Sequence, residues 1–154
     1  MSSEVLAELR RKVGLESQAY QSAVDDFDAA VALRLKINRT DMRCLEVLVN
    51  EDGAAPKRLA SRLGLTTGSV TAMLDRLERA GHLTRSPDPQ DRRRLLVRIT
   101  PETEQRVWGL YGPLIAEGQQ VAGRYSEDEL RLVAGFLGAS RELYERHLDR
   151  VRTS

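Results

Sequence analysis

The sequence predicts a mainly α-helical fold with one small β-hairpin. Apolar residues recur at spacings of three and four over most of the chain, which is typical of amphipathic helices. Two short apolar runs, Leu83-Thr84 and Leu95–Ile99, instead flank the polar segment Asp88–Arg94 and read as two strands and their loop. A helix–turn–helix pattern ends directly before this hairpin, at Gly81. Together these observations predict a winged helix–turn–helix with further helices at both ends for dimerisation.

The first predicted helix covers residues 15–36. We expect residues 2–13 to form a separate short helix or a loose arm, with Gly14 between the two. The apolar stripe of the long helix consists of Ala19, Ala23, Phe27, Ala30, Val31 and Leu35.

A second helix is predicted to begin after Asn38, which suits a cap. Asp41 follows three residues later, where a carboxylate stabilises the exposed amides of the first turn. We expect Asp52-Gly53 to end this helix. Its buried stripe is predicted to be Met42, Leu45, Leu48 and Val49.

The third and fourth helices form the helix–turn–helix. Pro56 fits the first position of the third helix, because its missing N–H is not needed there, and Gly64 closes that helix. Thr66 is predicted to cap the fourth helix, roughly residues 67–80, which stops at Gly81.

Two more helices follow the hairpin. Thr100 caps the fifth helix and Pro101 opens it, whereas the run Ser126–Glu129 has the form of a capping box for the last helix. We therefore divide the chain into a DNA-binding region, 37–100, and a helical dimerisation region made of 1–36 and 101–154.

The terminal helices are too amphipathic to stand alone. Packing against a second copy of the chain covers their apolar faces and makes a homodimer. The alternative is a bundle formed within one chain.

Basic residues are concentrated in the middle of the chain. Residues 53–99 contain ten Lys or Arg and four Asp or Glu, whereas the remainder contains 14 basic and 19 acidic residues. A basic centre between acidic flanks indicates a module that binds a polyanion. The alternative is chance clustering on a solvated face.

The fourth helix separates into two faces when residues are placed 100° apart. The apolar face is predicted to hold Val70, Met73, Leu74 and Leu77. The other face holds Gly68, Ala72, Asp75, Arg76 and Arg79, flanked by Ser69 and Thr71. Small residues and hydroxyl groups followed by arginine suit entry into a major groove, although an ordinary solvated face is the alternative.

The hairpin tip carries Arg92, Arg93 and Arg94 in succession. A hairpin tip is narrow enough to approach a minor groove, whose negative potential attracts arginine. A protein adaptor needs no such tip, which disfavours an interaction or architectural module without a specific operator as the alternative function.

Four segments resemble the MarR family of bacterial transcription regulators. They are LASRLGLT at 59–66, SVT at 69–71, DRLERAG at 75–81 and DPQDRR at 88–93. The resemblance covers roughly residues 38–100 and implies a winged-helix dimer that binds a palindromic operator. Such proteins are usually repressors, and a small ligand often releases them from DNA.

The resemblance also assigns roles to individual residues. It places Asp91 as the brace of the wing arginine that reaches the minor groove, and Arg93 is our choice for that arginine. Ala72 departs from the family pattern, in which many members have a larger polar residue. The candidate DNA-binding residues are Thr66, Gly68, Ser69, Thr71, Arg76, Arg92, Arg93 and Arg94.

Nothing in the sequence indicates an enzyme, a metal site or a cofactor. His82, His147 and Cys44 lack metal-ligand spacing, and there is no glycine-rich phosphate loop or nucleophile motif. We expect His82 to pack at the root of the wing. Cys44 lies in the second helix, away from the position of the family's redox-sensing thiols, and is interpreted as a small buried hydrophobe.

A ligand pocket is expected where the dimerisation helices meet the winged helix. Trp108 and Tyr111 are three residues apart, so they share a helix face that could flank a small aromatic or amphipathic effector. The alternative is that the same residues form the dimer core. The candidate pocket residues are Phe27, Val31, Met42, Trp108 and Tyr111.

The sequence thus predicts a ligand-responsive repressor that binds double-stranded DNA as a homodimer. We expect it to be cytoplasmic, since no apolar run approaches the ~20 residues of a membrane span and the N-terminus lacks a secretory signal pattern. No membrane partner is expected.

Overall fold

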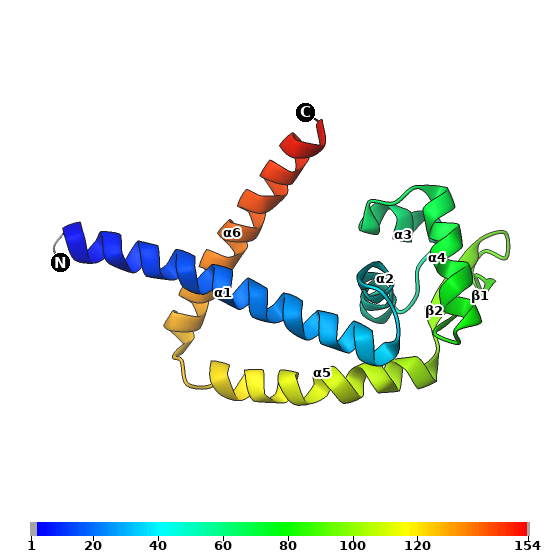
Figure 1. The fold of residues 1–154 in the computed structure, drawn as a ribbon, viewed down its shortest axis with the longest axis horizontal. Helices are drawn as coiled ribbons and strands as arrows, with labels where there is room; N and C mark the ends of the chain where they lie inside the picture. Colours follow the sequence, from blue (N-terminus) through cyan, green and yellow to red (C-terminus); the bar gives the residue numbers. More distant parts are fainter. Residues whose placement is uncertain (1–2, 154) are drawn as a thin grey trace. The chain divides into compact units, whose positions relative to one another are not determined.

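A computed structural model describes residues 3–153 of the chain as six helices and one two-stranded antiparallel sheet (Figure 1). The chain divides into two compact units, the first ending at Trp108 and the second beginning at Gly109. Within residues 3–153, no helix combines the length and apolar character that crossing a bilayer requires.

The first helix, α1, is a single element over Ser3–Leu35. The predicted interruption at Gly14 was therefore wrong; Ser2, also part of that prediction, lies outside the described residues. One glycine costs only about 1 kcal/mol in a helix interior, which is too little to break a helix that continues on both sides. Burial in α1 is confined to its last turns, at Val31, Ala32 and Leu35.

The predicted caps of the next two helices are confirmed. α2 spans Arg39–Asn50, and the Asn38 side chain accepts a hydrogen bond from the Asp41 backbone N–H at 2.8 Å. α3 spans Pro56–Leu63, with its proline in the first turn. Gly64 ends α3 in the left-handed region at φ 65°, a conformation that glycine adopts without steric cost.

The recognition helix, α4, spans Thr67–Arg79. Its cap is the predicted one, because Thr66 Oγ1 accepts a hydrogen bond from the Ser69 N–H at 3.2 Å. The predicted apolar face is also confirmed: Val70, Met73, Leu74 and Leu77 are buried. With side chains of α2, α3 and the hairpin they form the core of the first unit.

The hairpin, or wing, consists of β1, Leu83–Pro87, and β2, Leu95–Ile99. Leu83 pairs with Ile99 at the root, and Pro87 pairs with Leu95 toward the tip. β1 is longer than the predicted Leu83-Thr84, because Arg85, Ser86 and Pro87 continue the pairing without being apolar.

The segment before α3 pairs with the root of the wing. Ala54 and Val97 exchange two backbone hydrogen bonds of 2.9 Å each. Gly53 precedes this bridge at φ 104°, and a Cβ there would lie 3.0 Å from the Val97 carbonyl oxygen. A glycine is thus required for the close approach that anchors the wing.

The last two helices are α5, Pro101–Ala122, and α6, Glu127–Thr153. The predicted capping box is confirmed, since the Ser126 N–H donates to Glu129 Oε2 at 2.8 Å and the Glu129 N–H donates to Ser126 Oγ at 3.3 Å. No residue of α6 is buried. Its exposed apolar side chains include Leu130, Val133, Phe136, Leu137, Leu143 and Leu148.

Candidate nucleic-acid interface

The N-terminal half of α4 presents an open surface of small residues. Gly68, Ser69, Thr71 and Ala72 are exposed, on the side away from the buried apolar face. A Cβ added at Gly68 would meet no atom within 4 Å. This surface can therefore approach a DNA groove closely.

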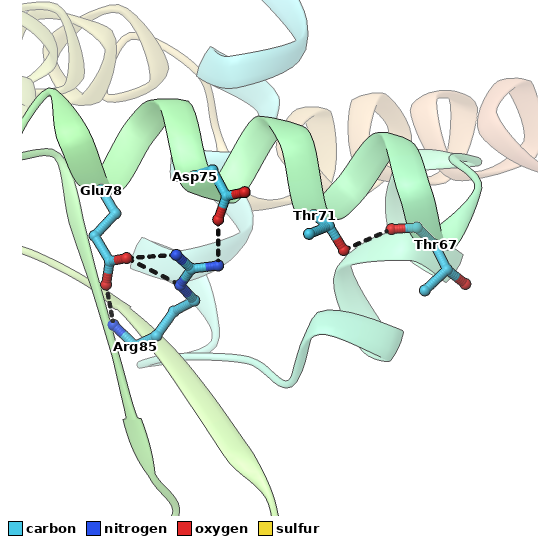
Figure 2. Close-up of polar contacts among 5 residues, drawn as sticks. All are labelled: Thr67, Thr71, Asp75, Glu78 and Arg85. Carbon is cyan, nitrogen blue, oxygen red and sulfur yellow. Dashed lines mark hydrogen bonds and ion pairs between the residues drawn. The ribbon is translucent and has the colours of Figure 1, made fainter.

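The hydroxyl groups on this half of α4 are ordered by the helix itself. Thr66 Oγ1 donates to Ser69 Oγ at 2.9 Å, which leaves the Ser69 hydroxyl proton for another acceptor. Thr71 Oγ1 donates to the Thr67 carbonyl oxygen at 3.0 Å and keeps its lone pairs as acceptors (Figure 2). The two hydroxyls can thus play complementary parts at a phosphate or a base edge.

Arg76, the predicted arginine of the recognition helix, forms an ion pair within the protein. Its Nε lies 3.1 Å from Asp41 Oδ2 and its Nη2 lies 2.5 Å from Asp41 Oδ1. The carboxylate is buried, whereas half of the arginine side chain is exposed. The hydrogen bond to Asp41 raises the pKa of Arg76. The side of the guanidinium that faces away from Asp41, which includes Nη1, is the part of Arg76 that is available to DNA.

The wing tip is organised by Asp91. Its Oδ1 accepts a hydrogen bond from the Arg93 backbone N–H at 3.1 Å, and its backbone oxygen accepts from the Arg94 N–H at 2.8 Å. Its carboxylate forms an ion pair with the Arg94 side chain, 3.3 Å from Nε. Within the described part of the chain, no carboxylate forms an ion pair with Arg92 or Arg93. Asp91 thus positions the Arg93 backbone and holds the Arg94 side chain.

A further arginine, Arg85 of β1, was missed by the sequence reasoning. Its Nη1 lies 2.7 Å from Asp75 Oδ1, and its Nη2 lies 2.5 Å from Glu78 Oε2 (Figure 2). The sequence reasoning placed Asp75 on the open face of α4, whereas here it faces the wing. Two carboxylates three residues apart, followed seven residues later by an arginine, are the signal that could have identified this clamp.

His82 is buried at the root of the wing, which confirms its predicted packing role. It is 5% exposed, and its Nδ1 lies 3.0 Å from Thr103 Oγ1 of α5. Burial lowers the pKa of His82, and the positive charge of Arg106 lowers it further.

Cys44 is also buried, as predicted. Burial first, and the negative charge of Asp41 second, raise the pKa of the Cys44 thiol to about 12. A group of three or more His, Cys, Asp or Glu side chains fit to hold a metal ion is absent from residues 3–153.

The structure places the candidate pocket residues in different surroundings. Val31 and Met42 are buried, Phe27 is partly buried and Trp108 is half exposed, all in the first unit. Tyr111 belongs to the second unit. A hollow of about 340 Å³ beside Met42 is otherwise lined by charged side chains: Asp25, Asp28, Arg39, Arg43 and Glu46. The aromatic pocket remains a prediction.

An open recognition helix followed by an arginine-tipped wing defines the class of winged-helix DNA-binding proteins. The MarR family model matches residues 37–95. An uncharacterized helix–turn–helix transcriptional regulator of Bacillus subtilis, YcgE, is 33% identical over 126 residues, which is 82% of each chain. This chain belongs to the MarR family, so it is a DNA-binding transcriptional regulator and not an enzyme.

Solved structures share the fold. The S. aureus MepR F27L mutant bound to an oligodeoxyribonucleotide is 21% identical, with a TM-score of 0.55, covering 84% of this chain and 97% of that one. NadR in complex with 4-hydroxyphenylacetate is also 21% identical, with a TM-score of 0.59, covering 82% and 89%. At this level of identity the likeness concerns the fold alone.

Proposed function

We propose that this regulator is a ligand-responsive repressor that binds a palindromic operator as a homodimer. One observation carries the proposal: a single compact unit holds both the open N-terminal half of α4 and an arginine tip on which Arg92 and Arg93 have no ion-pair partner within residues 3–153. A recognition helix in a major groove and arginines in the adjacent minor groove together read sequence and groove shape. Since such a regulator acts where the cell keeps its DNA, we propose the cytoplasm as its site of action.

The residues divide into two sets of contacts. Gly68, Ser69 and Thr71 approach base edges, whereas Thr66 and the free face of Arg76 lie over the sugar–phosphate backbone. At the tip, Arg92 and Arg93 are available to the minor groove and Arg94 to a phosphate. This assignment follows from exposure and from which donors are already used.

The dimer follows from the apolar side chains left uncovered on the terminal helices. α1 exposes Val5, Leu6, Leu9 and Val13, and α6 exposes a row of leucines with Phe136. We propose that 1–36 and 101–154 form the dimerisation region and cover these side chains with those of a second copy. Two recognition helices about 34 Å apart would then meet successive turns of one duplex face.

Release by a small molecule follows from the same arrangement. The complex of NadR with 4-hydroxyphenylacetate shows that this fold can hold a small aromatic compound. We propose that Phe27, Val31, Met42 and Trp108, all of the first unit, bind an aromatic or amphipathic effector. Binding would change the spacing of the two recognition helices, and a change of a few ångströms prevents both from docking.

Selection of duplexes from a random-sequence pool tests the proposal without knowledge of the operator. We expect enrichment of a palindrome with half-sites about 10 base pairs apart, bound by two chains per duplex. Affinity should fall on the order of 10³–10⁵-fold between 50 and 200 mM salt for about 6–10 phosphate contacts. Equal binding to every duplex would instead identify an architectural or protein-interaction module.

A further inference from the structure

The inner part of the wing, up to Arg85 and its strand partner Val97, is attached to the core. Leu83 and Val97 are buried there, and Ala54 bridges to Val97. Farther out, a hollow of about 670 Å³ is lined by residues of α3, by Thr67, Val70 and Thr71 of α4, and by Arg94 and Leu95 of the wing. Open space therefore adjoins both the outer wing and the half of α4 that would enter the major groove.

Arg85 joins β1 to α4. Residues two apart point to the same side of a strand, so Arg85 lies on the same side as the buried Leu83. Arg85 is half-buried, whereas Pro87, the next residue on that side, is exposed. The contacts of Arg85 thus lie where β1 leaves the packed part of the wing, since Ser86 and Pro87 beyond it are exposed.

The contacts of Arg85 with α4 fix the orientation of β1 as well as its distance from that helix. Besides the two ion pairs, Arg85 Nε lies 3.1 Å from Glu78 Oε2, and the Arg85 backbone N–H donates to Glu78 Oε1 at 3.1 Å. Both side chain and backbone of one strand residue are therefore held by one helix residue, with Asp75 as a second point (Figure 2). A planar guanidinium held by two carboxylates allows few orientations.

We propose that Arg85 is a positioning residue for DNA binding, which sets the angle between the wing and the recognition helix. This inference rests on the proposed function. With the clamp formed, the wing arginines and α4 engage neighbouring grooves of the same duplex; without it, the tip samples other directions. Partly exposed ion pairs contribute little to folding stability, so the effect falls on DNA affinity.

The alternative role for Arg85 is a direct phosphate contact. Its Nε, Nη1 and Nη2 each face a carboxylate oxygen, and three-quarters of the side chain is covered. The clamp therefore already uses three of the five N–H donors of Arg85, and little of the side chain is open to a phosphate.

The test measures affinity for a duplex that the wild-type protein selects from a random pool. We expect Arg85→Gln to bind this duplex about 5–150-fold less tightly than the wild-type protein does. This loss is at most the cost of losing a wing contact. In a background without the three tip arginines (Arg92→Ala, Arg93→Ala and Arg94→Ala), Arg85→Gln should add less than about twofold, because the contacts that it positions are already gone. Arg98→Gln, which removes a wing arginine without an ion-pair partner in residues 3–153, is the matched control and should bind like the wild type.

A second variant separates positioning from direct contact. Asp75→Asn with Glu78→Gln keeps Arg85 but frees it from the clamp, and we expect this variant to bind as weakly as Arg85→Gln. Three results would each overturn the proposal: binding by this variant that equals or exceeds that of the wild type, unchanged binding by Arg85→Gln, or the full effect of Arg85→Gln in the background without the three tip arginines. If the wild-type protein selects no duplex, the proposed function itself fails, and the role of Arg85 fails with it.

Discussion

Arg76 of the recognition helix and Asp41 of α2 are joined by a two-point ion pair, although 35 residues separate them in the chain. Asp41 is 2% exposed, whereas the Arg76 side chain is 51% exposed. The carboxylate therefore depends on the guanidinium to balance its charge, but the guanidinium can also be solvated by water. This asymmetry determines what removal of each partner does.

Removal of Arg76 should destabilise the protein more than removal of the Asp41 charge. Arg76→Ala leaves a buried carboxylate unpaired, and we expect a loss near the lower end of about 3–5 kcal/mol in the free energy of unfolding, since one side of the pair faces solvent. Asp41→Asn leaves an exposed arginine and should cost less. Urea denaturation of both variants measures the difference.

Arg79→Ala is the matched control, because Arg79 is an exposed arginine of the same helix with no ion-pair partner in residues 3–153. It should unfold like the wild type. Equal losses for Arg76→Ala and Asp41→Asn would show that burial of the carboxylate does not govern this pair.

The features that sequence reasoning predicted are those set by neighbouring residues. The caps Asn38, Thr66 and Ser126 act within three residues of themselves, and the apolar face of α4 follows from helical periodicity alone. The Asp41–Arg76 pair and the Arg85 clamp depend instead on how α2, α4 and β1 pack. A helical wheel showed that Arg76 and Asp75 are off the apolar face, but not which element faces them.

Two predictions were wrong for a different reason: each infers the end of a helix or strand from residue type alone. Gly14 predicts a break in the first helix, but the small helix penalty of one glycine does not outweigh the turns on both sides. The end of the apolar run predicts that β1 stops at Thr84, whereas strand pairing is a backbone property that Arg85 and Ser86 continue. The same error hid the positioning role of Arg85.

Removal of Arg93, one of the two tip arginines without an ion-pair partner in residues 3–153, should weaken DNA binding without changing the fold. We expect Arg93→Ala to cost about 1–3 kcal/mol in binding, while circular dichroism and assembly remain those of the wild type. Asp91→Ala should also weaken binding, because Asp91 holds the Arg93 backbone and the Arg94 side chain. Arg10→Ala, an exposed arginine of α1 far along the chain from the wing, serves as control. Loss of helicity together with loss of binding would mark Arg93 as structural.

Charges on one face of α6 should separate the proposed dimer. Phe136 and Leu143 are seven residues apart, which places them on the same side of the helix, and each is 47% exposed. Phe136→Glu with Leu143→Glu should yield a monomer or an insoluble protein, as measured by light scattering during size-exclusion chromatography. Glu142→Lys changes an exposed residue that lies about 100° or more around the helix from Phe136, Leu143 and the other apolar side chains named for α6, and it should leave the assembly unchanged. If the double variant stays dimeric, the dimer interface does not include this side of α6.

Acid should destabilise the protein partly through His82. Its pKa in the folded protein is lowered by burial and by Arg106, against the opposing effects of Asp41 and a hydrogen bond to the Leu35 backbone. The unfolded chain therefore binds a proton more readily than the folded one, and stability falls as pH drops below the ordinary histidine value of about 6.5. The slope from this one group cannot exceed about 1.4 kcal/mol per pH unit. Urea denaturation at pH 7.5 and 5.5 should show a smaller loss for His82→Gln than for the wild type, and an equal loss in both would assign the acid sensitivity to other groups.

Cys44 should make no contribution to regulation by oxidants. Reaction with peroxide requires the thiolate, and a thiol with a pKa of about 12 is ionised in on the order of one molecule in 10⁵ at neutral pH. The side chain is also fully buried, and the chain has no second cysteine that could resolve a sulfenic acid. We therefore expect mild peroxide to leave the affinity for the selected duplex unchanged. Cys44→Ser should bind DNA like the parent, with a small loss of stability from a hydroxyl group in an apolar site. If peroxide releases the parent but not Cys44→Ser from DNA, the core around Asp41 must open often enough to expose the thiol, and oxidation would then take the place of the small-molecule effector.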